Sequence, residues 1–271
     1  MNTINLTDKD YKILDIKEYK KKFATEKDST RLINEDTLVN YNGQPIILYK
    51  KIKENTEDVH WAVRSMKYAK SNRTSYMKQL GKSKLFGFMP RRVLRQDYCN
   101  TVTTARDYPK QHSIITNFGK TLTNYYQEYF PHILKEHYKI VKEKVKKDWT
   151  ITDTPFTSGI INQNNQLRYH TDKGNFKGVL SNMLCFKNGI TGGRLVCPEY
   201  NLKFEIDNDY LLIFDGQQII HGVTPIIKTH AKGYRYTIVY YTLEQMWKCE
   251  TVDDELLRIR ELKKQREHKR L

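Results

Sequence analysis

The chain has 271 residues, of which 38% are hydrophobic and 12% aromatic, and its formal net charge is +16. This composition excludes a disordered chain, and because no run of about 18 apolar residues is present, no transmembrane helix is expected. The positive charge favours a polyanionic partner such as nucleic acid, bound through its phosphates. The alternative is a lysine-rich composition without such a role.

The cysteines and the N-terminus indicate where the protein works. The first five residues lack the charged segment and apolar block of a secretory signal. Cys99, Cys185, Cys197 and Cys249 are scattered, with no Cys-x-x-Cys pair. This pattern argues against a zinc knuckle and for a reducing setting. We therefore expect an intracellular protein, cytoplasmic or nuclear, with no membrane association and no obligate protein partner.

Residues 1–60 are mixed in character and carry no evident chemistry. Within them, residues 37–49 predict two strands joined by a tight turn at Asn42-Gly43. Asn-Gly between two apolar runs is the strongest short-range signal for a hairpin.

Residues 61–96 form a basic stretch that contains no Asp or Glu. Cations for phosphates and aromatic rings for unstacked bases would together suit a nucleic-acid track. The alternative is a solvated basic face whose aromatic residues belong to the core. Arg64, Lys67 and Lys70 would share one side of a helix because they are spaced three apart. The aromatic residues of the stretch include Trp61, Tyr68, Tyr76, Phe86 and Phe88. The cations predicted to contact the nucleic-acid backbone are Arg64, Lys67, Lys70, Arg91 and Arg92.

The rest of the chain alternates between helical and strand-rich segments. Residues 113–147 show helical periodicity interrupted at Pro131. His132 and His137 lie five apart, a poor spacing for ligands on one helical face, and are interpreted as structural or surface residues. From 152 to 241, short β-branched and aromatic runs between turns predict a sandwich or jelly roll. Residues 243–271 predict a helix with an acidic start and a basic end.

A candidate metal centre lies within the strand-rich part. His170-x-Asp172 is followed by His221, 51 positions on, and Arg235 follows 14 positions later. Two imidazoles and one carboxylate can hold one face of an octahedral Fe(II) and leave positions open for cosubstrate and O2. Alternation along a strand would put His170 and Asp172 on the same side. A buried Arg235 could bind the distal carboxylate of 2-oxoglutarate through two parallel hydrogen bonds. Taken singly, each residue also has an ordinary structural explanation.

These motifs together resemble the TET and J-binding-protein oxygenases. The matching segments are Phe156–Gly159, His170-x-Asp172, Gly192-Gly193-x-Leu195, His221–Pro225 and Arg235-x-x-x-Val239-x-Tyr241, within residues 85–242. The resemblance implies a double-stranded β-helix core, Fe(II) bound by His170, Asp172 and His221, and 2-oxoglutarate bound by Arg235. It also implies that Asn175 hydrogen-bonds a flipped base and that Tyr241 stacks on it. The chain departs from the TET pattern at Leu243, where those enzymes carry His, so cytosine and thymine both stay open.

We thus predict an α+β protein with a jelly-roll (double-stranded β-helix) core backed by helices. Its expected parts are a mixed segment with the basic stretch (1–84), the oxygenase domain (85–242) and a C-terminal basic helix (243–271). The expected function is hydroxylation of the 5-methyl group of a pyrimidine in DNA, with 5-methylcytosine favoured over thymine. The alternatives are a 2-oxoglutarate-dependent hydroxylase of a protein side chain or small molecule, and a non-catalytic nucleic-acid-binding module.

Overall fold

The computed structural model describes residues 1–70, 81–92 and 98–268. Residues 71–80 and 93–96 of the predicted basic stretch, which include its cations and aromatic residues Arg73, Tyr76, Lys78 and Arg95, lie outside these ranges. None of the helices within the described ranges combines the length and apolarity that a bilayer crossing requires.

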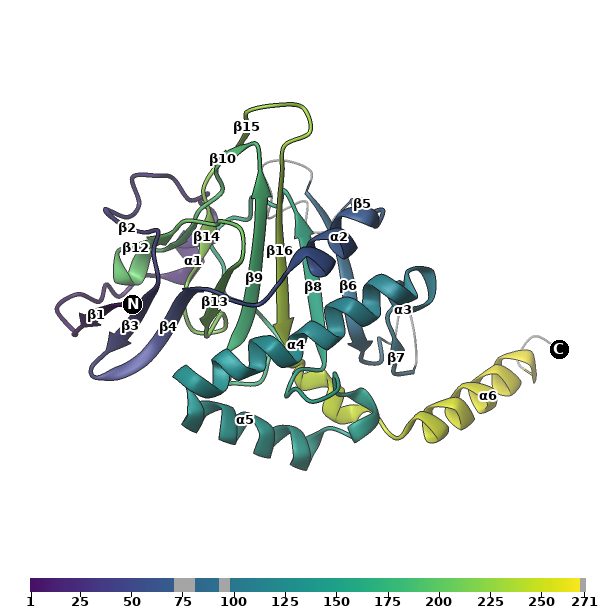
Figure 1. Cartoon of the computed structure of the whole chain (residues 1–271). Helices are drawn as coiled ribbons and strands as arrows, with labels where there is room; N and C mark the ends of the chain where they lie inside the picture. The colour runs from purple at the N-terminus through teal and green to yellow at the C-terminus, as the bar shows by residue number, and fades with distance from the viewer. Residues whose placement is uncertain (71–80, 93–97, 269–271) are drawn as a thin grey trace.

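One large, mostly antiparallel sheet carries the architecture (Figure 1). Its strands run in the order β1 (Asn2–Leu6), β3 (Thr37–Tyr41), β4 (Gln44–Lys51), β13 (Tyr210–Phe214), β9 (Ser181–Asn188), β16 (Tyr234–Tyr241), β8 (Ser158–Gln163), β6 (Lys82–Met89) and β5 (Ala69–Lys70), and β7 (Asn100–Thr101) pairs with β6. Among the described strands of this sheet, the β1–β3 pairing alone is parallel. Strands β1, β3 and β4 thus extend the same sheet as the core strands. The predicted boundaries of the three parts stay predictions.

A smaller sheet faces the large one and completes the jelly roll. Its strands are β14 (Gly222–Val223), β11 (Leu195–Cys197), β12 (Leu202–Phe204) and β2 (Arg31–Ile33), beside the pair β10 (Ile190–Gly192) and β15 (Ile226–Lys228). Apolar side chains from both sheets, such as Met183, Leu195 and Phe204, form one buried cluster between them. The predicted fold class is therefore confirmed.

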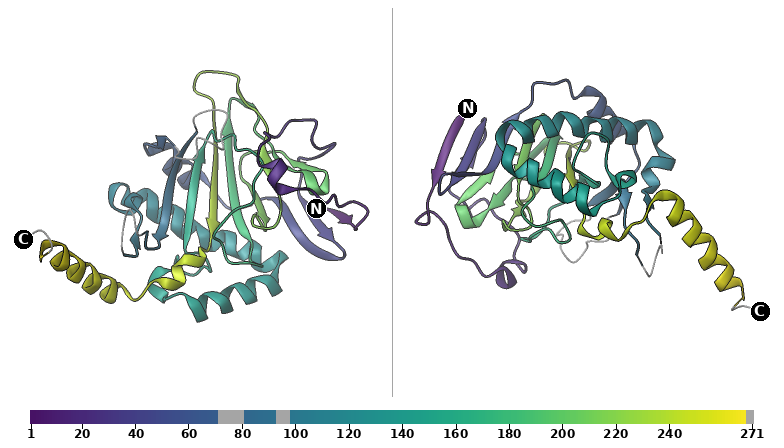
Figure 2. Two further views of the ribbon diagram at one scale, coloured as in Figure 1. Left: turned by 180° about the vertical axis from the view of Figure 1, so that it is seen from behind. Right: turned by 90° about the horizontal axis from the view of Figure 1, so that it is seen from below.

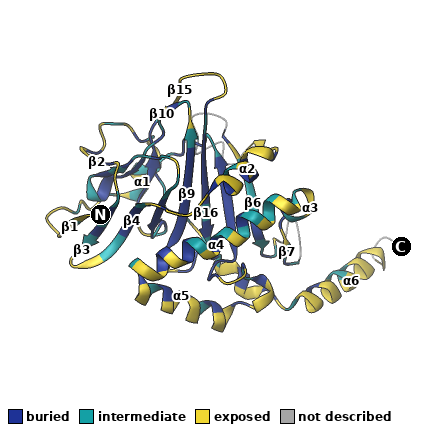
Figure 3. Cartoon of the chain, in the orientation of Figure 1, coloured by how far each residue is buried: buried dark blue, intermediate teal, exposed yellow. Residues whose placement is uncertain are grey.

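Helices cover the outer face of the large sheet (Figures 1 and 2). They are α2 (Glu57–Ser65), α3 (Thr103–Asp107), α4 (Pro109–Tyr129) and α5 (Pro131–Lys144). The break at Pro131 is confirmed. Proline is tolerated in the first turn of α5 because an amide N–H there has no partner within the helix. The remaining elements are α1 (Ile16–Tyr19), the 3₁₀ turns η2 (Lys147–Trp149), η3 (Pro198–Tyr200) and η4 (Glu244–Lys248), and α6 (Val252–His268), which projects from the body and is mostly exposed (Figure 3).

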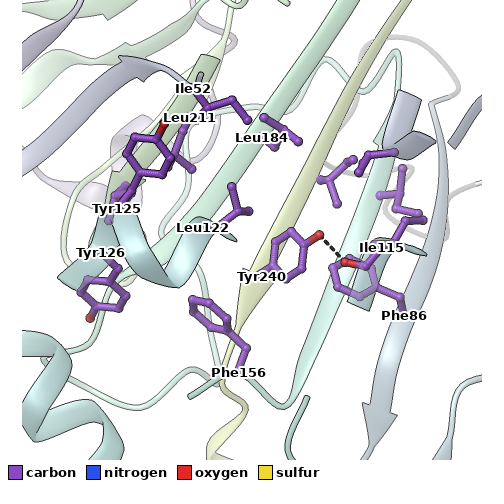
Figure 4. Packing of buried hydrophobic residues seen from close by; sticks show 14 of the residues in the cluster. Ile52, Phe86, Ile115, Leu122, Tyr125, Tyr126, Phe156, Leu184, Leu211 and Tyr240 are labelled. Carbon is purple, nitrogen blue, oxygen red and sulfur yellow. Dashed lines mark hydrogen bonds between the residues drawn. The ribbon is translucent and has the colours of Figure 1, made fainter. Parts of the chain in front are cut away.

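Strand alternation divides the side chains between two cores. On β16, Tyr236, Ile238 and Tyr240 turn toward the helices, where they join the cluster shown in Figure 4. The Tyr240 hydroxyl donates a hydrogen bond of 2.6 Å to the Ile115 carbonyl of α4, which fixes this helix on the sheet. The odd-numbered residues of β16 therefore face the opposite side, between the two sheets.

The hairpin at Asn42-Gly43 is confirmed. Strands β3 and β4 pair antiparallel, with Asn42 (φ 48°) and Gly43 (φ 78°) between them. Positive φ at both central residues is what a two-residue hairpin turn requires, and Asn and Gly adopt it most readily.

Two predictions about the basic stretch are wrong. Arg64, Lys67 and Lys70 do not share a helical face, because α2 ends at Ser65 and Lys70 lies on β5. The rings are not all free for bases either. Phe86 is fully buried in the helix–sheet core, and Tyr68 packs against that core. The alternative reading of these two aromatic residues as core is correct.

A disulfide joins Cys99 to Cys249, with 5.8 Å between their Cα atoms. It ties the chain before β7 to the segment before α6 and lies in a buried cluster with Trp149, Phe176 and Met246. Residues 150 apart in sequence give no local spacing signal, so the scatter of the cysteines did not indicate this pair. The predicted intracellular location is not tested by the fold and stays a prediction.

Candidate metal centre and active site

The two predicted histidine ligands are held side by side by their own backbones. His170 N donates to His221 O, and His221 N donates to His170 O, both at 2.9 Å. The sequence analysis placed His170 and Asp172 on a strand, but here the structure has isolated bridges, from Arg168 to Phe23 and from His170 to His221. This mutual pair brings the imidazole centroids to within 4.3 Å of each other.

Hydrogen bonds fix both imidazoles in the same tautomer. His170 Nδ1 lies 2.8 Å from the Arg168 carbonyl, and His221 Nδ1 lies 3.0 Å from the Ile219 carbonyl. A carbonyl oxygen can only accept, so each Nδ1 must carry the proton and each Nε2 presents a lone pair. Histidines that bind metals typically donate their other N–H in this way.

Asp172 completes the candidate ligand set. Its Oδ1 lies 3.7 Å from His170 Nε2, and one ligand atom from each of Asp172, His170 and His221 lies within 4.8 Å of the others. Asp172 N donates to the Gly216 carbonyl at 2.7 Å, which fixes the backbone of the carboxylate. A Cβ at position 216 would overlap Asp172 Oδ2, so this close approach requires glycine.

The loop beside Asp172 is organised by Asp215. This carboxylate accepts the backbone N–H groups of Gln217 (2.9 Å) and Gln218 (3.2 Å). Burial raises its pKa, and the nearby charge of Asp172 adds to that effect. The loop thereby holds Gly216 against Asp172.

Arg235 is a buried cation facing the space between the sheets. Its side chain is 2% exposed, and burial lowers the pKa of the guanidinium to about 10, so the group stays charged at neutral pH. Nε donates to the Gly193 carbonyl at 2.9 Å. Within residues 1–70, 81–92 and 98–268, no carboxylate forms an ion pair with Arg235. A buried cation without an anion is costly, so the site is suited to an anionic ligand.

A cavity of about 250 Å³ connects these groups. The three candidate ligands, Arg235 and Tyr241 line it, and so do Thr237 and Val239 between them on β16. Alternation explains this row, because residues 235, 237, 239 and 241 all face the same side of the strand. The structure thus brings together the residues predicted for metal and cosubstrate.

The predicted base contacts line the same cavity. Asn175 is 7% exposed, and its Nδ2 donates to Ser181 Oγ at 3.3 Å. Its backbone pairs with Leu243, which also lines the cavity, and Gln217 Nε2 donates to its carbonyl. Ser181 and Gln217 were not predicted. The signals that could have pointed to them are positional: Ser181 follows the His-x-Asp motif closely in sequence, and Gln217 follows Asp215-Gly216 directly.

The five cations predicted for the nucleic-acid backbone have different surroundings. Arg92 is exposed and lines the cavity, whereas Arg91 forms an ion pair with Glu255 of α6. Although the basic stretch itself contains no acidic residue, Arg91 within it is paired by a carboxylate from a helix distant in sequence. The Arg64 guanidinium lies over the Tyr234 ring, 4.8 Å from its centroid. Lys67 and Lys70 are exposed. Lys173, exposed and directly after Asp172, was not predicted but also lines the cavity.

The donor set fits Fe(II). Two imidazole nitrogens and one carboxylate on one side of a cavity leave coordination positions open, as in non-haem Fe(II) oxygenases. The protein's own hydrogen bonds set the two tautomers and hold Asp172 in place. Arg235 is a buried cation suited to an anionic ligand.

Comparisons with known proteins agree with this geometry. The family model Tet/JBP, described as the oxygenase domain of the 2OGFeDO superfamily, matches residues 94–244. The chain is similar to the bifunctional helicase and thymine dioxygenase JBP2 of Leishmania tarentolae, at 23% identity over 123 residues (45% of this chain and 11% of that protein). The corresponding protein of Trypanosoma brucei brucei is 25% identical over 106 residues (39% and 10%). The chain therefore matches about a tenth of the length of these curated relatives.

A solved structure shares the fold. NgTET1 in complex with 5mC DNA superposes with a TM-score of 0.59 at 13% identity, covering 85% of this chain and 90% of that chain. The family match covers more than half of the chain, from the region before α3 to the end of the jelly roll. The chain therefore belongs to the Tet/JBP family of 2-oxoglutarate- and Fe(II)-dependent dioxygenases.

Proposed function

We propose that this protein hydroxylates the 5-methyl group of a pyrimidine in DNA, with 5-methylcytosine as the first substrate and thymine as the competing one. The observation that carries the proposal is one cavity lined both by the His170, Asp172 and His221 cluster with Arg235 and by Asn175 and Tyr241. The names of the similar proteins, a thymine dioxygenase and a TET protein in complex with 5mC DNA, support this substrate class.

In this proposal different residues of the cavity bind the metal and the cosubstrate. His170, Asp172 and His221 hold Fe(II), and Arg235 binds the distal carboxylate of 2-oxoglutarate. When bound, the iron and 2-oxoglutarate activate O2 for hydroxylation of a C–H bond. The apolar side chains that line the cavity, such as Leu195 and Val223, limit the access of water.

Asn175 and Tyr241 would hold the base in the same cavity. Extruding a base from a duplex costs a few kcal/mol. Stacking on an aromatic ring such as Tyr241 offsets this cost by about 1–3 kcal/mol. Asn175 Nδ2 is directed to Ser181, which leaves its Oδ1 to accept from a base. Cytosine offers its N4 amine and thymine its N3–H, so this acceptor suits either.

Phosphates beside an extruded base would meet cations at the cavity. Arg92 and Lys173 both line the cavity and both are exposed. Exposed cations of this kind contribute salt-dependent, sequence-independent affinity. They are therefore stronger candidates for backbone contacts than Arg91, whose guanidinium is engaged by Glu255.

The test is an incubation with Fe(II), 2-oxoglutarate and matched duplexes that contain 5-methylcytosine or thymine at one position, followed by digestion and mass analysis of the nucleosides. We expect one oxygen atom to be gained on a pyrimidine, with succinate released in proportion. Asp172→Ala should abolish both, because it removes a ligand, whereas Asp153→Ala, at an exposed surface carboxylate, should not. Succinate release with a protein or small-molecule substrate and no gain on DNA would refute the proposal.

A further inference from the structure

A buried carboxylate lies behind the candidate metal ligand His221. Glu199 on η3 is 5% exposed and accepts two hydrogen bonds, from Tyr11 Oη (3.1 Å) and from Ile220 N (2.7 Å). In the described part of the chain no lysine or arginine forms an ion pair with it. Burial raises the pKa of this carboxyl group, so its ionised form is costly here. Both partners are donors, as an ionised carboxylate requires.

The Ile220 N–H belongs to the same peptide group as the Ile219 carbonyl. That carbonyl accepts the Nδ1–H of His221 at 3.0 Å. One planar amide therefore links the Glu199 carboxylate on its N–H side to the His221 imidazole on its carbonyl side. A charge-assisted bond to the N–H polarises the amide and strengthens the carbonyl as an acceptor, by about 10–30% per bond in a chain of this kind.

We infer that Glu199 is a positioning residue of the metal centre, which acts on His221 through the Ile219–Ile220 amide. The linked bonds hold the imidazole in its Nδ1–H tautomer and make its Nε2 a stronger donor to a divalent cation. The inference rests on the proposed role of His221 as a ligand. It goes beyond that role by assigning a function to Glu199, which is linked to the ligand His221 through the Ile219–Ile220 amide.

The other histidine shows that the arrangement is not a general consequence of the fold. His170 Nδ1 bonds to the Arg168 carbonyl, and the N–H of the same amide, on Tyr169, donates to the Lys22 carbonyl at 3.1 Å. That chain ends on a neutral acceptor. The chain behind His221 ends on a carboxylate. The hydrogen-bond chains behind the two candidate ligands thus end on different acceptors, and Glu199 should affect His221 and not His170.

A purely structural role for Glu199 makes a different prediction. Tyr11 donates to its side chain, and Lys12 N donates to its backbone carbonyl at 2.7 Å, so Glu199 also anchors the N-terminal segment. Tyr11→Phe removes the side-chain anchor and leaves the carboxylate on Ile220. If anchoring were the whole role, Tyr11→Phe and Glu199→Gln would have the same effect on the metal site.

The experiment measures Co(II) affinity by calorimetry, with the full chain and without 2-oxoglutarate or nucleic acid. Glu199→Gln keeps the shape and an acceptor but removes the charge, and we expect about tenfold weaker binding, the low end for outer partners of metal-bound histidines. Tyr11→Phe should stay within about twofold. Glu255→Gln is the matched control, because Glu255 is also buried and accepts backbone N–H groups but does not line the cavity of the candidate ligands. It should lower the melting temperature and leave Co(II) affinity unchanged.

A measurement on the unaltered protein covers the case in which Glu199→Gln does not fold. On binding of diamagnetic Zn(II), the amide proton of Ile220 should shift downfield in the NMR spectrum by more than that of Tyr169, because its acceptor is a carboxylate. Equal shifts would overturn the inference, as would unchanged Co(II) affinity in Glu199→Gln. Failure of the unaltered protein to bind any metal would instead refute the metal centre, and with it the inference.

Discussion

Replacing Arg235 by lysine tests the cosubstrate site without any knowledge of the nucleic-acid substrate. Arg235→Lys keeps a positive charge in a site where the native side chain is 2% exposed. It removes the planar fork that can grip a carboxylate with two parallel hydrogen bonds. It also removes the 2.9 Å bond from Nε to the Gly193 carbonyl, which aims that fork.

The expected loss follows from the number of bonds. Lysine can make one charge-assisted bond to the carboxylate where arginine makes two, and such a bond contributes about 1.5–3 kcal/mol. The dissociation constant of 2-oxoglutarate should therefore rise roughly 10- to 100-fold, since about 1.4 kcal/mol is a factor of ten. The burial that lowers the pKa of Arg235 to about 10 acts on a lysine from a lower starting value. The affinity of the variant should therefore fall further as the pH rises from 7 to 9, while that of the native protein stays level.

Calorimetric titration of 2-oxoglutarate into Mn(II)-loaded protein measures both effects. Arg194→Lys is the matched control. Arg194 is a partly buried arginine of the same region, and its guanidinium is engaged by Glu205 (2.6 Å) and Glu26 (2.7 Å). This control should bind 2-oxoglutarate as the native protein does. Unchanged affinity in Arg235→Lys, or an equal loss in Arg194→Lys, would refute the assignment of Arg235.

Three further predictions concern the metal ligand, acid stability and the disulfide. Gly216→Ala introduces a Cβ that overlaps Asp172 Oδ2, so Co(II) affinity should fall about tenfold or more by calorimetry while the apo protein still folds; unaltered affinity would contradict the role of this close approach. Burial lowers the pKa of His137 from 6.5 to about 3, so its contribution to stability is present above pH 6.5 and is lost progressively as the pH falls toward 3. Denaturant unfolding should show about 2 kcal/mol of this loss at pH 5, and His137→Gln should lack that part of the acid sensitivity. Cys99→Ser removes a cross-link to Cys249 that closes a loop of 150 residues, and unfolding should become easier by about 2–4 kcal/mol; equal stability of the variant under oxidising conditions would show that the bond contributes little.

The clustering of the candidate metal ligands could be predicted in part because the relevant spacing is local. His170 and Asp172 are two apart, so even a short extended segment turns both to one side. On β16, Arg235 and Tyr241 are an even number of residues apart and share a face for the same reason. His221 required the fold, because only the pairing of distant segments brings it beside His170.

The features that could not be predicted depend on contacts between distant segments. Glu255 neutralises Arg91 from 164 residues away, and Cys99 pairs with Cys249 across 150 residues. Nothing near either position in the sequence identifies its partner. The predicted helical face of the basic stretch failed for another reason. The chain leaves the helix at Met66, whose ψ of 150° is extended, and its buried side chain packs in the core. Tertiary packing decided the conformation where charge periodicity did not.

Strand β16 sets the geometry of the proposed reaction. Arg235 and Tyr241 stand six residues apart on one face, which corresponds to roughly 20 Å at about 3.4 Å per residue. The candidate ligands line the same cavity, so a cosubstrate bound at Arg235 and a base stacked on Tyr241 would share it with the metal while lying at different points along the strand. Residues 237 and 239 fill the interval with Thr and Val, and neither competes for the metal. The spacing in Arg-x-x-x-Val-x-Tyr therefore keeps both side chains on the cavity side of the strand, and a one-residue insertion between Arg235 and Tyr241 would turn one of the two side chains into the helix-facing core.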